Sequence, residues 1–257
     1  MLRLGQVLLG VSIAALGALT LGIHDFALAW SPLPKWLVLH DALAAAFAAL
    51  LLAAGVAVLV PRAARPAALL LAILLLLQLL LQVPLIVKHP LVMVVYENAG
   101  ETLSELGGAW TLFSLLPDGP LAALRNVRIG RILFALALLP FGLAHFVYLE
   151  MTAPLIPSWL PFHVPLAWFT GAAYVAAGLG ILFGVLPRLA ATLNAVMVSL
   201  FTLVIWVPAV IAAPAKLSDW SEFCVSTAIT GAAWIAAASF AATHGWVSRQ
   251  NPSSSKA

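Results

Sequence analysis

Long stretches of the sequence are almost entirely apolar, and these stretches determine the expected fold. The run 67–77 shows none of the alternation of polar and apolar positions that a transmembrane β-strand requires. Because a helix needs about 20 apolar residues to cross a hydrocarbon core of ~30 Å, the pattern predicts an all-α membrane protein. We expect eight transmembrane helices, at residues 4–24, 37–60, 66–87, 99–117, 130–149, 163–186, 189–212 and 222–243.

Composition supports lipid as the solvent of this chain and narrows its function. Of the 257 residues, 64% are hydrophobic and only 8% are charged, whereas soluble domains carry roughly a quarter charged residues. The net charge of +3 comes from basic residues that form no patch, so we expect no nucleic-acid partner. Cys224 is the only cysteine, which excludes an intrachain disulfide relay.

The charges between the predicted spans divide between two sides. One side carries most of the arginines, including Arg62, Arg128 and Arg188, with Asp118 as its only acid. The opposite side carries the remaining acids and five of the six histidines. The positive-inside rule therefore predicts that both termini are cytoplasmic, in a bacterial inner membrane, with the acidic side facing outward.

Short motifs recur in the same order in the two halves of the chain. The matched pairs are Gly22–Phe26 with Gly142–Phe146, Pro34–Leu37 with Pro157–Leu160, Ala53–Gly55 with Ala176–Gly178, Pro61–Arg62 with Pro187–Arg188, Val83–Pro84 with Val207–Pro208, and Gly107–Trp110 with Gly231–Trp234. We interpret residues 1–120 and 121–247 as two four-helix repeats, and 248–257 as a disordered cytoplasmic tail. Each repeat holds an even number of spans, so the repeats are parallel and their outer ends share one face.

These motifs carry a family resemblance. The second half, with Gly142–Phe146, Ile156–Pro161, Pro187–Ala191 and Glu222–Trp234, resembles the DoxX-like membrane proteins, and the first half looks like a diverged copy. The family is named for a subunit of an archaeal thiosulfate:quinone oxidoreductase, and most of its members are four-span proteins of unassigned activity. The resemblance implies a helical-bundle fold and a quinone-linked redox role.

Five ionisable residues near the outer ends of the predicted spans are candidates for a catalytic pocket: His24, Asp41, Glu101, His145 and Glu222. If the first and fourth spans of each repeat are neighbours, His24 pairs with Glu101 and His145 with Glu222, and Asp41 joins either pair. A structural explanation stands beside this one. A loop carbonyl would satisfy each imidazole, and the two glutamates would stabilise the starts of their helices.

Four further residues at membrane depth are candidates for cofactor contacts. Trp110 and Trp234 are predicted to lie too deep for an interfacial aromatic belt and to pack within the bundle beside small residues. Gln78 and Gln82 share one helical face and should point away from lipid, as interhelical hydrogen-bond donors or substrate contacts. A metal site is not expected, because His24, Asp25, His40 and Asp41 have suitable ligand atoms without a compact metal-binding spacing.

Two functional hypotheses follow. In the first, the chain is a quinone-linked redox subunit or accessory protein that works with a redox partner, and its outward-facing His/Glu pocket handles a small molecule or a proton. In the second, it is a non-enzymatic assembly factor or a small-molecule carrier with a site between the repeats. The few charges at the predicted membrane centre and the lack of an evident broken helix argue against a carrier.

Overall fold

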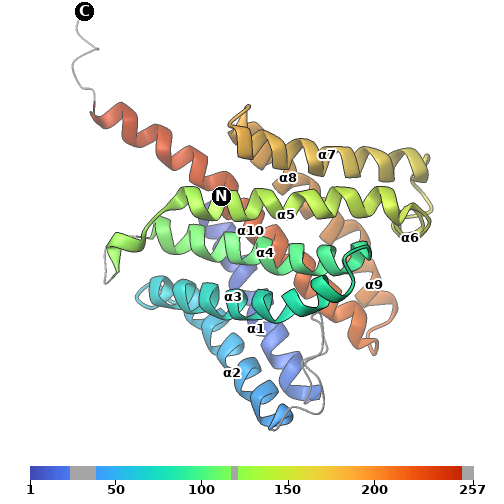
Figure 1. Ribbon diagram of the computed structural model, residues 1–257, viewed down its shortest axis with the longest axis horizontal. Coiled ribbons are helices and arrows are strands. Elements are labelled where there is room, and N and C mark those ends of the chain that lie inside the picture. Colours follow the sequence, from blue (N-terminus) through green and yellow to red (C-terminus); the bar gives the residue numbers. More distant parts are fainter. Residues whose placement is uncertain (24–38, 117–120, 251–257) are drawn as a thin grey trace, which may run out of the picture.

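The computed structural model describes residues 1–23, 39–116 and 121–250, and these residues fold as a bundle of helices (Figure 1). Its longer helices are α1 (Leu2–Ile23), α2 (His40–Leu59), α3 (Ala64–Lys88), α4 (Met93–Leu115), α5 (Val127–Val147), α7 (His163–Phe183), α8 (Pro187–Phe201) and α10 (Leu217–Gln250). Shorter elements are η1 (Ala122–Leu124), α6 (Leu149–Thr152), η2 (Ala153–Leu155), the π-helical turn η3 (Thr202–Trp206) and α9 (Val207–Ala212).

Seven helical segments among the described residues are long and apolar enough to cross a membrane. They are Leu2–Ile23, His40–Leu59, Ala64–Lys88, Val127–Val147, His163–Phe183, Pro187–Ala212 and Leu217–Ala241. The chain is therefore a multi-pass helical membrane protein by the length and composition of its helices. The fourth predicted span, 99–117, corresponds to α4, which is not among the seven. It is 23 residues long but carries Glu97, Glu101 and Glu105.

The largest differences between the predicted and the observed boundaries are in α4 and α10. Helix α4 begins at Met93, six residues before the predicted start at 99. The polar residues of its first turns do not end the helix, because Val95, Ala99 and Gly100 are buried against neighbouring helices. At the other end, α10 continues to Gln250, so the first residues of the predicted disordered tail are helical. Residues 251–257 of that tail lie outside the described residues.

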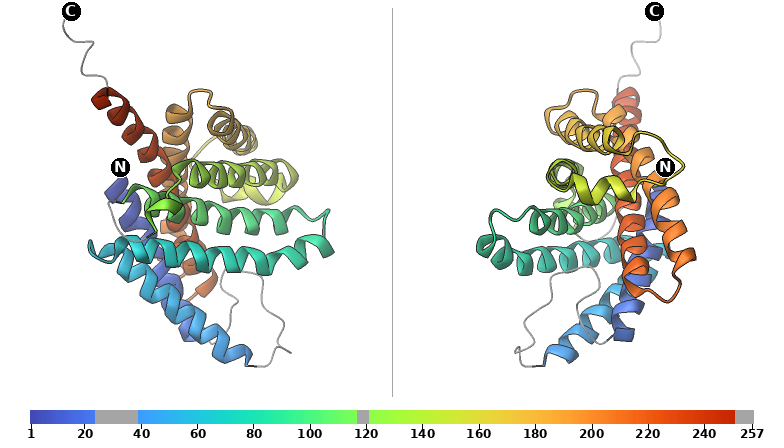
Figure 2. Two further views of the ribbon diagram at one scale, coloured as in Figure 1. Left: turned by 60° about the vertical axis from the view of Figure 1, so that its left-hand side comes forward. Right: turned by 90° about the vertical axis from the view of Figure 1, so that its right-hand side faces the viewer.

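The order of packing differs from the order that the sequence suggested. Helices next to each other in the chain pack side by side from α1 to α4 and from α5 through α7 and α8 to α10. The two halves then join crosswise, α4 against α5 and α10 against α1, while α4 and α10 also touch (Figures 1 and 2). The condition for pairing within each half, that its first and fourth spans are neighbours, is met only marginally, since α1 makes few contacts with α4, and α5 few with α10.

Glycines allow the two crosswise interfaces to be close. A Cβ atom placed on Gly5 of α1 would lie 2.6 Å from the carbonyl oxygen of Gly231 in α10. A Cβ atom placed on Gly130 of α5 would lie 2.8 Å from the carbonyl oxygen of Gly107 in α4. The backbones are in contact at both places, as small-residue faces permit between membrane helices. The two interfaces have nearly the same local geometry.

Glycine contacts also show which positions of α1 and α5 correspond to each other. Gly142 of α5 packs on the backbone of Gly171 and Val175 in α7. In the first half the corresponding contact is made by Gly17 of α1, against Ala48 and Leu52 of α2. Gly22, which the sequence comparison matched with Gly142, would meet no atom within 4 Å. The match of Gly22 with Gly142 is therefore shifted by about one helical turn relative to the packing.

Candidate functional site

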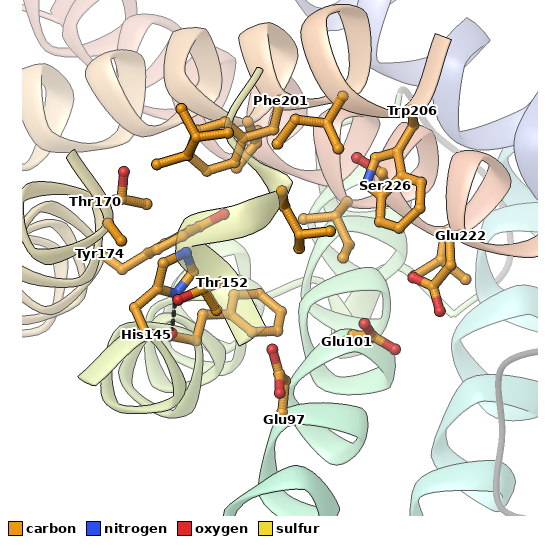
Figure 3. A pocket seen from close by; sticks show the side chains of 18 residues that line it. Glu97, Glu101, His145, Thr152, Thr170, Tyr174, Phe201, Trp206, Glu222 and Ser226 are labelled. Carbon is orange, nitrogen blue, oxygen red and sulfur yellow. Dashed lines mark hydrogen bonds between the residues drawn. The ribbon is translucent and has the colours of Figure 1, made fainter. Parts of the chain in front are cut away.

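A cavity of about 200 Å³ lies between α4, α5, α7, α8 and α10, near the starts of α4 and α10 and the end of α5 (Figure 3). Segments α6, η2 and η3 complete its wall. The side chains with polar atoms in its lining are Glu97, Glu101, His145, Thr152, Thr170, Tyr174, Trp206, Glu222 and Ser226. An apolar cavity with a few convergent polar groups is typical of a small-molecule site. Two other hollows, one among α3, α4 and α5 and one between α7 and α8, are apolar almost throughout.

His145 lies half-buried near the end of α5, with its ring in the cavity wall (Figure 3). Its Nδ1 is 2.8 Å from the backbone carbonyl oxygen of Phe141. A carbonyl oxygen only accepts hydrogen bonds, so Nδ1 carries a proton and donates it. The other ring nitrogen, Nε2, has no hydrogen-bond partner among the described residues. In the neutral imidazole, Nε2 is therefore a proton acceptor available to a ligand.

Three carboxyl groups reach the same cavity from two helices. Glu97 and Glu101 are half-buried and stand four residues apart on α4, so they share one face of that helix. Glu222 of α10 is exposed at the rim. No lysine or arginine is among the residues that line the cavity. A ligand or added protons must therefore compensate the carboxylates, because burying uncompensated charge is costly.

Helix capping does not explain these glutamates. Glu101 lies eight residues after Met93, and Glu222 lies five residues after Leu217. The favourable interaction of an acid with the helix dipole falls off within the first turn. The earlier starts of α4 and α10 thus remove the structural explanation that the sequence left open for Glu101 and Glu222.

Aromatic rings form the deep side of the cavity. Tyr174 of α7 is buried, and its ring centroid lies 5.5 Å from Phe141, 5.5 Å from His145 and 6.3 Å from Phe201. These separations lie in the range of favourable aromatic pairs. In Figure 3 the phenol oxygen of Tyr174 points between the surrounding helices toward the centre of the cavity. The rings hold the His145 imidazole in place and keep this side of the cavity apolar.

A π-helical turn, Thr202–Trp206, interrupts the span Pro187–Ala212 where this span borders the cavity. The hydroxyl of Thr202 lies 2.7 Å from that of Ser226 and 3.0 Å from that of Thr230, both on α10. Pro208 follows the turn within α9. The span Pro187–Ala212 continues through this turn, and turns of this kind often mark functional sites.

The structure brings together only part of the predicted pocket. His145, Glu101 and Glu222 line one cavity. Asp41 does not, because it is exposed at the start of α2, where its Oδ1 lies 3.1 Å from Nδ1 of His40. His24 and Asp25 lie outside the described residues. Among the described residues, no group of three His, Cys, Asp or Glu side chains is placed to hold a metal ion.

The four candidates for cofactor contacts lie away from the cavity. Gln78 and Gln82 of α3 are 5% and 2% exposed, which confirms that they point away from lipid. Nε2 of Gln82 donates a hydrogen bond to the Thr102 hydroxyl of α4 at 3.0 Å, as expected of an interhelical donor. Trp110 and Trp234 both pack against the core.

The hydrogen bonds of the two tryptophans differ. Trp234 Nε1 donates to the Ser199 hydroxyl on α8 at 3.0 Å. Trp110 Nε1 donates to the backbone carbonyl of Asn126, which precedes α5, at 3.1 Å. Helix α4 ends at Leu115, so Trp110 stands within two turns of the helix end and not near its middle. Neither tryptophan contributes to the cavity lining.

Glu97 and Tyr174 are cavity residues that the sequence analysis did not select. A signal for Glu97 was present, because Glu97, Glu101 and Glu105 recur at every fourth position and so share a helix face. For Tyr174 we find no comparable signal, since a tyrosine within an apolar span is commonly a packing residue.

Comparisons with known proteins supply no relative for this chain: no family model, curated protein or solved structure matches it.

Proposed function

We propose that this protein is a quinone-linked membrane subunit or accessory protein, and that the cavity around His145 binds the quinone head group. The observation that carries the proposal is the unpartnered Nε2 of His145, which faces a ring-sized apolar cavity shared with three carboxyl groups. A cavity of about 200 Å³ suits a single substituted six-membered ring. The tail of a larger quinone would remain outside it.

The chemistry of the lining suits both forms of such a ligand. A quinol hydroxyl can donate its proton to Nε2 of His145, and a second hydroxyl can donate to a carboxylate of Glu97 or Glu101. The oxidised quinone has two carbonyl oxygens, which accept hydrogen bonds from protonated forms of the same groups. The two electrons of a quinol would leave to a separate redox protein, in keeping with a subunit role. The resemblance to DoxX-like proteins, which implies quinone chemistry, points the same way.

We further propose the arrangement in the membrane. The chain crosses a bacterial inner membrane eight times as two parallel four-helix repeats, with α4 as the eighth crossing and both termini in the cytoplasm. The nearly equal contacts of Gly5 with Gly231 and of Gly130 with Gly107 support a duplication. The arginine-rich loops support the orientation. The cavity then opens toward the outer surface.

A carrier is the second candidate, and the π-helical turn beside the cavity favours it. Irregular helical segments often lie at functional sites, and secondary transporters place their binding sites at irregular parts of their helices. A carrier would release the ligand on both sides of the membrane without changing its redox state. Uptake of the ligand into proteoliposomes that contain only this protein would distinguish a carrier from a redox subunit.

The experiment that tests the proposal is native mass spectrometry of the full chain released from mild detergent, together with solvent extraction and chromatography of its quinones. We expect quinone to co-purify with the wild-type protein and to be lost from the variant His145→Leu. Thr20→Val, a change at a buried position of α1, is the control and should retain it. Absence of quinone from wild-type protein, even after incubation with a short-chain quinone, would contradict the proposal.

A further inference from the structure

Helix α4 carries a third glutamate in line with the two that border the cavity. Glu97, Glu101 and Glu105 recur at every fourth residue, so successive side chains stand on one face with a rise of about 6 Å between them. Glu105 does not line the cavity, and its side chain is 0% exposed. The glutamates thus form a row that runs from the cavity into the bundle interior.

Glu105 lacks partners in an apolar part of the bundle. Neither carboxyl oxygen has a hydrogen-bond partner among the described residues. Among the described residues, the charged side chains of α1, α3, α5 and α10 lie within about two turns of the ends of those helices. Glu105, in contrast, lies in the fourth turn of α4. An ionised carboxylate without a partner in such a place would be very unfavourable. A carboxyl group that holds a proton and bonds to water is the stable alternative.

Gln78 of α3 supplies a second group with unmet hydrogen bonds at the same level. Its side chain is 5% exposed, and neither its amide nitrogen nor its amide oxygen has a hydrogen-bond partner within the part of the chain that the structure describes. Gln82, one turn later on α3, bonds to Thr102 of α4. Helices α3 and α4 are antiparallel neighbours (Figure 1). Because Gln82 bonds to Thr102, Gln78, one turn earlier on α3, lies at about the level of the α4 turn that holds Glu105.

Ordered internal water molecules commonly lie between buried polar groups that have no direct hydrogen-bond partner, such as these two at one level of neighbouring helices. Such a water typically makes about three hydrogen bonds to otherwise unsatisfied groups. Gln78 offers both a donor and an acceptor, and the carboxyl group of Glu105 offers the same when it is protonated. A water between them would give hydrogen-bond partners to polar atoms whose burial without partners destabilises the folded protein.

We propose that Glu105 is a buried proton-binding site, hydrated by a water held between it and Gln78, and that it exchanges its proton with the cavity through Glu101. In the exchange, the Glu105 carboxyl gives its proton to a bridging water, and this water passes another of its protons to the carboxylate of Glu101; the reverse step returns a proton from Glu101 to Glu105. Each exchange moves one proton outward and one inward, and no electron moves. The link to a ligand in the cavity rests on the proposed quinone function, whereas proton binding by Glu105 does not.

Infrared difference spectroscopy of the full chain without ligand, in light and heavy water, tests this proposal. We expect a carbonyl band of a protonated carboxyl group that is lost in Glu105→Gln. The matched control Glu150→Gln changes an exposed glutamate in α6 and should keep that band. In Gln78→Leu the band should shift, because the water loses its second anchor. In Glu101→Gln its exchange in heavy water should slow, because the route is cut.

The outcomes separate clearly. A spectrum in which Glu105→Gln removes no band shows an ionised Glu105 and overturns the proposal. An unchanged band position in Gln78→Leu overturns the shared water, and unchanged exchange in Glu101→Gln overturns the route through the cavity. If Glu105→Gln does not fold, the shift in Gln78→Leu still decides. All these spectra are recorded without quinone, so failure of quinone binding leaves them readable.

Discussion

The interiors of the two halves differ although their backbones pack alike. The glycine contacts indicate that Gly17 corresponds to Gly142 and Leu52 to Val175. By this alignment, Thr20 is the counterpart of His145, and Leu51 is the counterpart of Tyr174. Leu51 is fully buried in the hydrophobic core, whereas Tyr174 borders the cavity. These two corresponding positions thus hold a packed leucine in α2 and a cavity-lining tyrosine in α7. Side-chain identity, and not backbone arrangement, makes the site.

The largest expected effect concerns the interfaces that the halves share. Gly107→Val and Gly231→Val each drive a side chain into neighbouring backbone, so each should lower the free energy of unfolding by about 3 kcal/mol or more. Equal losses of thermal stability in detergent would strengthen the comparison between the halves. Gly22→Val, where a Cβ meets no atom within 4 Å, is the control and should change little. A large loss at only one of the two interfaces would break the comparison.

The second prediction contrasts the corresponding positions Leu51 and Tyr174. Leu51→Ala leaves a hole in a packed core and should cost about 3 kcal/mol. Tyr174→Leu removes aromatic contacts beside an existing cavity and should cost only about 1 kcal/mol. Chemical denaturation of both variants measures the difference. Equal costs would indicate that the second half is packed as tightly as the first.

The third prediction concerns ligand affinity and not stability. His145→Leu and Glu101→Gln should each weaken the binding of a short-chain quinone about tenfold, or about 1.4 kcal/mol. Because both line one cavity, the double variant should lose less than the sum of the two single losses. Quenching of tryptophan fluorescence measures this, since Trp206 borders the cavity. Strictly additive losses would show that the two residues act on the ligand independently.

The smallest expected effect concerns the polar contacts of one residue in each half, Gln82 and Thr202. Gln82→Leu removes the bond from α3 to Thr102, and Thr202→Val removes the bonds from η3 to Ser226 and Thr230. Each should cost about 0.6 kcal/mol, a typical value for hydrogen bonds between membrane helices. Unfolding of the reconstituted protein measures both losses. A loss several times larger in Thr202→Val would show that the π-helical turn depends on these bonds.

Much of the fold was predictable because each apolar run is long enough to require a membrane. The start of α4 was not, since Glu97 and Asn98 look like loop residues until Val95 and Ala99 are seen buried against other helices. The crosswise packing was also beyond the hydrophobic pattern. Spans that are apolar on all sides do not indicate which face meets which neighbour. Only the glycine positions carried that information.

The cavity residues were predictable to the extent that their chemistry is unusual at membrane depth. His145, Glu101 and Glu222 were selected because ionisable groups in apolar helices are costly. His145 and Glu222, which the sequence paired, line one cavity, but Glu101 joins them there because α4 packs on α5 across the halves, a contact that the sequence did not indicate. Tyr174 acquires its role only from its distance to His145, which no local pattern encodes.

The crosswise packing of α4 on α5 and α10 on α1 has a consequence for single-repeat chains. A protein with only one such four-helix unit would leave the glycine face of its last helix uncovered, and it would have to form a homodimer to cover it. That ancestor-like dimer would carry two identical sites, because its symmetry forces both to have the same residues. If this chain arose by the duplication proposed above, fusion into one polypeptide removed this restriction, so the residues of one site could change independently of those of the other.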